Sequence, residues 1–179
     1  MAQSPRLPEL LRPGLDLVIC GTAASSVSAA RGQYYAGPGN RFWSVLAETK
    51  LTARLLDPSE FRLLLDFGIG LTDVVKDQHG MDREIDFSGW GALLQRRLAP
   101  HAPRCLCFNG KRAAREAGIK IVEYGWRTET FGPTRLFVAP STSAAARRWW
   151  DGDVWEELAG FVRSASEPSA AMPGPPPRA

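Results

Sequence analysis

The sequence predicts an α/β fold of three layers (α/β/α), in which a central, mainly parallel β-sheet lies between helices. Two observations support this prediction. Short apolar runs typical of buried strands, such as Leu17-Val18-Ile19-Cys20, alternate along the chain with segments that have the spacing of apolar residues expected of helices. The first run ends in a glycine turn at Gly21, then a long loop and a helix, which is how parallel α/β proteins build ligand sites at the carboxyl ends of their strands.

The expected elements follow one another in this alternating order. A strand at 16–20 leads to a helix at 41–49, for which Asn40 is a good N-cap. The next helix begins at Asp57-Pro58, because Asp is favoured at the N-cap and Pro in the first turn. The remaining elements are a short strand or tight loop at 68–75, a helix at 88–98, a strand at 104–108, a helix at 111–117, strands at 119–124 and 136–139, and a helix at 153–163.

The length of 179 residues suits a single domain with a full core. We expect a flexible N-terminal arm at 1–13, the domain at 14–163, and a disordered tail at 164–179 that is rich in Pro, Ser and Ala. No apolar run approaches the ~20 residues of a membrane span, and the start of the chain lacks the apolar segment of a signal peptide. The three cysteines are expected to be reduced core thiols, which favours a cytoplasmic protein.

Three loops follow expected strand ends, at 21–40, 70–80 and 139–147, and should meet at one edge of the sheet. The first loop combines glycines, which let the backbone approach a ligand, with aromatic residues that can stack on a flat one. The third carries Ser and Thr hydroxyls at the start of a helix, an arrangement that binds phosphate. The net charge of +3 permits nucleic-acid binding without requiring it.

Four segments resemble, in order and spacing, the mismatch-specific uracil/thymine-DNA glycosylases of the uracil-DNA glycosylase superfamily. They are GQYYAGPGNRFW at 32–43, GIGLTD at 68–73, FNGK at 108–111 and PSTSA at 140–144, and the resemblance runs from about Leu15 to Arg163. It implies the fold of that family. It also implies an enzyme that flips uracil, or another deaminated or mismatched base, out of DNA and cleaves its N-glycosidic bond to leave an abasic site.

The resemblance also implies roles for individual residues. Thr22, Ala23 and Tyr35 fall in the base pocket, and Tyr35 matches the aromatic residue that stacks on the extruded base. The expected DNA contacts are Lys111, Ser141, Thr142, Ser143, Ala144, Ala145, Arg147 and Arg148. Ala144 and Ala145 stand where a residue would fill the space left by the base, and Arg147 or Arg148 could share that work. We expect a nucleoid-associated monomer that acts on double- or single-stranded DNA, with no metal and no cofactor.

The chain departs from the family at the catalytic position, where Ala23 replaces the usual Asn and can neither orient nor deprotonate water. The catalytic role could have moved to Asp73, because a carboxylate near the sugar can accept a proton from water and stabilise developing positive charge. Asp73 could instead recognise the Watson–Crick edge of the base, or have a purely structural role as an N-cap or as a partner of another side chain. Asn40 is the second catalytic candidate, and helix capping alone would also explain it.

The sequence therefore predicts a monofunctional uracil-DNA glycosylase that uses water as its nucleophile. Two other interpretations remain. The absence of a polar group at Ala23 favours a protein that binds damaged or mismatched DNA and cleaves it weakly or not at all. The other interpretation is a hydrolase or transferase that acts on free nucleotides and uses Asp73 as its base.

Overall fold

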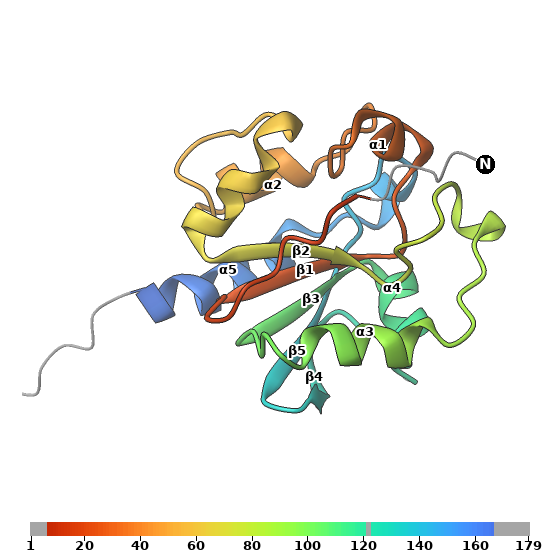
Figure 1. Cartoon of the computed structure of the whole chain (residues 1–179). Coiled ribbons are helices and arrows are strands. Elements are labelled where there is room, and N and C mark those ends of the chain that lie inside the picture. The colour runs from red at the N-terminus through yellow and green to blue at the C-terminus, as the bar shows by residue number, and fades with distance from the viewer. Residues whose placement is uncertain (1–6, 121–122, 167–179) are drawn as a thin grey trace, which may run out of the picture.

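The computed structural model describes residues 7–120 and 123–166. It shows the predicted three layers, with a central sheet between α2 (Phe42–Glu48) and α5 (Gly152–Ser166) on one face and α3 (Trp90–Leu98) and α4 (Lys111–Glu116) on the other (Figure 1). No helix in this described part of the chain is both long and apolar enough to cross a membrane.

The sheet has five strands in the order β2-β1-β3-β5-β4. Strands β1 (Leu17–Gly21), β2 (Ile69–Asp73), β3 (Cys105–Asn109) and β5 (Thr134–Ala139) are parallel, and β4 (Gly125–Phe131) pairs antiparallel with β5. Strand β1 is central, and Leu17 pairs with Ile69 on one side and with Cys105 on the other. The carboxyl ends of the four parallel strands therefore lie at one edge.

The edge strand is the main difference from the expected elements. The strand expected at 119–124 is not formed at 119–120, where the backbone N–H of Ile119 donates to the carbonyl of Ala114 at the end of α4. The strand begins at Gly125 instead, and residues 121–122 lie outside the described part. Most residues of β4 are partly or fully exposed, so this edge strand lacks the continuous apolar run of a buried strand.

The other predicted elements begin and end within two residues of the expected bounds, except that α5 ends three residues later than predicted. The helix that begins after Asp57 is the 3-10 helix η1 (Pro58–Phe67), opened by a capping box of Asp57 and Glu60. Two short 3-10 helices complete the chain, η2 (Asp82–Glu84) and η3 (Ala144–Trp149). Helix α5 continues to Ser166, so the chain at 164–166 is helical where a tail was expected, and residues 167–179 lie outside the described part.

One α-helix was not predicted, nor was the short 3-10 helix η2. Helix α1 (Ser26–Arg31) lies inside the segment that the sequence indicates as a loop. The Ser25 side chain accepts from the backbone N–H of Ser28 at its start, and Gly32 ends it in the left-handed conformation at φ 63°. Six residues with few large apolar side chains give too weak a periodic signal to be recognised in the sequence.

The core consists of two apolar clusters, one on each face of the sheet. Alternate residues of β1 supply them, because Leu17 and Ile19 point to the α2/α5 side while Val18 and Cys20 point to the α3/α4 side. Burying each large apolar side chain contributes roughly 1.5–3 kcal/mol to folding. All three cysteines are free and buried, as predicted, and burial raises the pKa of each thiol.

The segment 7–13 packs against the domain, which differs from the flexible arm expected for 1–13. Leu7 and Leu10 are buried, and Leu10 exchanges two backbone hydrogen bonds with Leu71 of β2 (2.9 and 3.0 Å). This pairing covers the open edge of β2, and the two leucines bury apolar surface that an arm in solvent would expose. Residues 1–6 lie outside the described part.

Candidate functional site

The candidate site lies at the carboxyl ends of β1, β2, β3 and β5, where the segments of the resemblance meet. Strand β1 is a topological switch point, because the chain leaves it toward β2 on one side and later returns as β3 on the other. In open α/β sheets a ligand binds at such a point. The loops that follow β1, β2 and β5 therefore surround one place, as predicted.

Gly21, Asp73 and Tyr35 are in close contact at this place. A Cβ added to Gly21 would lie 2.7 Å from Asp73 Oδ1 and 3.3 Å from the Tyr35 hydroxyl oxygen. The carboxylate and the phenol thus both lie over the backbone at the end of β1. Only a residue without a side chain permits this approach, which explains the glycine.

Asp73 forms a buried ion pair with Lys76, a residue that the sequence reasoning missed. Lys76 Nζ lies 3.0 Å from Asp73 Oδ2 and donates to the Tyr34 hydroxyl at 2.8 Å. The two charged side chains are only 4% and 12% exposed. The signal in the sequence was the spacing, since a lysine three residues after an aspartate at a strand end can turn back to pair with it.

Burial raises the pKa of the Asp73 carboxyl, while the positive charges of Lys76 and Arg97 act in the opposite direction. Oδ2 is the atom that pairs with Lys76, whereas Oδ1 faces Gly21. The carboxylate therefore has one oxygen held by a cation and one directed at the end of β1.

Tyr35 lies in the site with its ring braced by the protein. The ring stacks on Phe42, with centroids 3.9 Å apart and planes at 20°. Its backbone is in the left-handed region at φ 52°, which is rare for an aromatic residue. Its hydroxyl is buried and makes no hydrogen bond of ordinary length among the described residues. Burial, followed by the Asp73 charge, raises the pKa of that hydroxyl, while the nearby Asn109 side chain acts in the opposite direction.

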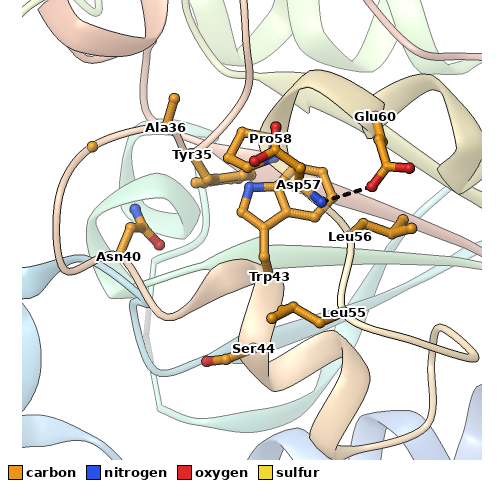
Figure 2. Close-up of a pocket in the computed structure, with 11 residues that line it drawn as sticks. Tyr35, Ala36, Asn40, Trp43, Ser44, Leu55, Leu56, Asp57, Pro58 and Glu60 are labelled. Carbon is orange, nitrogen blue, oxygen red and sulfur yellow. Dashed lines mark hydrogen bonds between the residues drawn. The ribbon is translucent and has the colours of Figure 1, made fainter.

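Asn40 borders a pocket of about 510 Å³ that opens beside Tyr35. Figure 2 shows Asn40 and Tyr35 on the loop before α2, facing the start of η1. Asn40 Oδ1 accepts the backbone N–H of Phe42, the first residue of α2, at 3.0 Å, as a capping side chain does. The N-cap position itself is occupied by Arg41, one residue later than predicted, and Arg41 makes no side-chain capping bond. Its amide nitrogen has no partner in the described part of the chain. The acidic residues Asp57 and Glu60 line the far side of the pocket.

Asn109 and Thr142 lock two of the loops together. The Asn109 amide donates to the Thr142 hydroxyl at 2.9 Å and accepts the Thr142 backbone N–H at 3.0 Å. The carbonyl of Thr142 accepts from the backbone N–H of Arg41 at 2.9 Å, which joins the start of α2 to the same point. Because Thr142 is buried, its side chain anchors the loop from within.

The other expected DNA-contacting residues lie mostly on the surface. Ser141 and Ser143 are half-buried, and Ser141 Oγ accepts the backbone N–H of Ser143 at 3.3 Å. Lys111 pairs with Glu123 at 3.1 Å, so its charge is partly neutralised. The exposed residues are Ala144, Ala145, Arg147 and Arg148.

Thr22 and Ala23 are occupied by contacts within the protein. The Thr22 hydroxyl donates to Asp82 Oδ1 at 2.7 Å. Ala23 packs against the apolar cluster on the α3/α4 side and offers no polar group. Of the residues expected in the base pocket or in catalysis, Asp73, Asn40 and Tyr35 are therefore the ones that can supply polar chemistry at this end of the sheet. No group of three or more His, Cys, Asp or Glu side chains suited to a metal ion occurs in the described ranges.

Comparison with known proteins gives two findings. A family model described as the uracil DNA glycosylase superfamily matches residues 8–159. The solution NMR structure of a candidate uracil DNA glycosylase from Methanosarcina acetivorans is similar to this chain, with a TM-score of 0.58 and 23% sequence identity over 92% of this chain and 99% of the other. At that identity the structural similarity shows a shared fold.

Proposed function

The chain belongs to the uracil DNA glycosylase superfamily, and on that premise we propose that it is a DNA glycosylase that excises uracil, or a related deaminated or mismatched base, by direct hydrolysis. The observation that supports this most is the contact of Asp73 and Tyr35 over Gly21, where the loops meet. A carboxylate beside an aromatic ring is the pair of groups needed to hold a flat base and activate water next to it.

In the proposed reaction the extruded base stacks on Tyr35. A water molecule gives a proton to Asp73 Oδ1 as its oxygen bonds to C1′ of the sugar. The bond between C1′ and the base nitrogen breaks, and its electron pair leaves with the base. The Asn40 amide nitrogen, which borders the pocket, can donate to the departing base and stabilise its negative charge.

Lys76 has a positioning role in this proposal. Its ammonium lies 3.0 Å from Oδ2. Burial raises the pKa of Asp73, whereas this cation lowers it and so favours the charged form of the carboxyl. In the charged form that this cation favours, the carboxylate can act as a base with Oδ1 toward Gly21. Exposed Arg147 and Arg148 are proposed to contact phosphates, and the protein is proposed to act on DNA at the nucleoid as a monomer.

A second function, recognition of damaged DNA without cleavage, is favoured by one observation. Ala23 offers no catalytic group, and the buried pairing of Asp73 with Lys76 is also what a purely structural ion pair would look like. The two proposals differ in a single measurable property, the formation of abasic sites.

The test uses an oligonucleotide with one uracil opposite guanine, under single-turnover conditions, followed by alkali to break the strand at abasic sites. We expect cleavage by the wild type. We expect Asp73→Asn to be slower by about 10²–10⁴-fold, the usual contribution of a positioned base, while DNA binding measured by fluorescence anisotropy changes little. Asp77→Asn, the same substitution at an exposed position four residues further on, is the matched control.

Each outcome decides between the proposals. No strand break at high enzyme excess, with tight binding retained, supports the binding protein. A near-normal rate for Asp73→Asn refutes Asp73 as the base, and Asn40→Ala is then the variant to measure. Binding to free nucleotides but not to DNA contradicts both proposals.

A further inference from the structure

Trp149 is an exposed aromatic side chain with no role in the site described so far. It is 53% exposed. The other large apolar residues that are exposed in the described part of the chain are not aromatic. The guanidinium of Arg148 lies 3.8 Å from the centroid of its ring. This cation–π contact orients the indole at the surface, and the rest of the ring is open to stack on a flat group from outside the chain.

The chain neighbours of Trp149 hold its segment, η3, against the loop before α2. Arg147 lies over Gly39, since a Cβ added to Gly39 would be 3.0 Å from the Arg147 guanidinium. Trp150 lies under the guanidinium of Arg41 at 4.5 Å and stacks on Trp155 of α5. Trp149 lies between these two anchored residues in the chain, and Thr142, seven residues earlier in the same segment, is hydrogen-bonded to Asn109.

Extrusion of a base leaves a gap in the DNA stack, and the unstacking energy is about a few kcal/mol. Proteins that kink or open DNA commonly insert an apolar side chain between bases to offset this energy. Ala144 and Ala145, at the positions where the family resemblance expects such a residue, are exposed but have only a methyl group each. They cannot fill a gap as large as a base.

We propose that Trp149 enters the duplex and fills the space vacated by the extruded base, while Arg147 and Arg148 contact the flanking phosphates. This inference rests on the proposed function, because it assumes that a base is extruded. The exposure of the indole, the contacts of its chain neighbours Arg147 and Trp150 with Gly39 and Arg41, and the adjacent basic residues all fit a contact with the duplex. The role is one of positioning, since Trp149 holds the base out of the stack and takes no part in bond cleavage.

The first test compares excision of uracil from duplex and from single-stranded DNA under single-turnover conditions. We expect Trp149→Ala to slow the duplex reaction roughly ten-fold, the size of one base–aromatic stack, and to leave the single-strand reaction nearly unchanged because there is no stack to fill. Trp149→Phe should restore most of the duplex rate. Leu93→Ala, which truncates another exposed apolar residue on α3, is the control.

The second test uses a modified nucleotide to fill the space that the truncated side chain leaves empty. A pyrene nucleotide opposite uracil occupies the vacated space, so it should rescue Trp149→Ala on duplex DNA while having less effect on the wild type. Equal losses on duplex and single strand, or no loss on either, would overturn the proposal, as would a failure of pyrene to rescue. All variants should keep the far-UV circular dichroism of the wild type, because the residue is on the surface.

A third measurement separates this inference from the proposed function. 2-Aminopurine placed beside the uracil becomes brighter when its neighbour leaves the stack, and an inserted indole quenches it again. If the wild type makes no abasic sites, the proposed function fails. Quenching by the wild type that disappears in Trp149→Ala then still supports insertion, and identical fluorescence for both proteins refutes it.

Discussion

The buried pair of Asp73 and Lys76 leads to a prediction that can be worked out from the structure. With 3.0 Å between Lys76 Nζ and Asp73 Oδ2, Coulomb attraction at an effective dielectric constant of about 20 is about 5.5 kcal/mol before any desolvation is subtracted. Replacing Lys76 by Met keeps the length of the side chain and removes the charge. Because this leaves one buried charge unpaired, we expect the free energy of unfolding at pH 7 to fall by about 3–5 kcal/mol.

The double variant Asp73→Asn/Lys76→Met is the comparison that identifies the cause. It removes both charges and leaves neither unpaired, so it should be more stable than Lys76→Met alone. The assay is equilibrium unfolding in urea followed by tryptophan fluorescence, with the dependence on urea concentration checked for a constant slope. Additive effects of the two single substitutions would refute a direct interaction between the side chains.

The pH dependence of Lys76→Met gives an independent check. Burial already raises the pKa of the Asp73 carboxyl in the folded protein, and loss of the neighbouring cation raises it further. A carboxyl with a raised folded-state pKa contributes stability below its unfolded-state pKa, and that contribution is lost as the pH rises through the folded-state value. Lys76→Met should therefore regain stability relative to the double variant as the pH is lowered from 7, and a flat difference would contradict this explanation.

Three further predictions concern the same end of the sheet. Gly21→Ala should lower the free energy of unfolding by about 1–3 kcal/mol, because the new Cβ would lie 2.7 Å from Asp73 Oδ1. Unfolding in urea measures this change. Gly37→Ala is the control, because a Cβ at Gly37 has no atom within 4 Å. Tyr35→Phe should leave the free energy of unfolding unchanged or raise it by about 1 kcal/mol, because the buried hydroxyl that it removes makes no hydrogen bond of ordinary length among the described residues. A large loss of stability in a thermal melt would show instead that the nearby Asn109 side chain holds this hydroxyl. Asn109→Ala should lower the free energy of unfolding by roughly 1–3 kcal/mol, since it leaves the buried polar groups of Thr142 without their partner. Amide hydrogen exchange at residues 140–143 should then be faster than in the wild type.

The order of the elements could be predicted because each has a local cause. The apolar run at Leu17–Gly21 has the continuous hydrophobicity of a strand buried on both faces, and Asp57 with Pro58 marks the start of η1. Where the local signal was weak, the prediction differed from the structure. Strand β4 is an exposed edge, α1 is short, and the segment 7–13 is ordered by its pairing with β2, a contact distant in sequence.

The candidate site could be predicted in part. The sequence identified the loops that meet. It selected Asp73 because a carboxylate in an apolar run is unusual, and Asn40 as a polar residue at a helix start, while the family resemblance selected Tyr35. It could not show that Asp73 is paired with Lys76, nor that Thr22 points to Asp82 and Thr142 to Asn109. The catalytic role of Asp73 and the DNA contacts stay predictions.

Sequence alone thus determined the α/β class, the order of most elements and the absence of a polar side chain at position 23, because these depend on periodicity, on turn-forming residues and on the identity of single residues. Only the tertiary structure decided which groups share the end of β1. Asp73 and Tyr35 are 38 residues apart in the chain, yet both lie over Gly21. The parallel pairing of β1 with β2 and the packing of Phe42 under Tyr35 bring them together, and neither contact has a local signature.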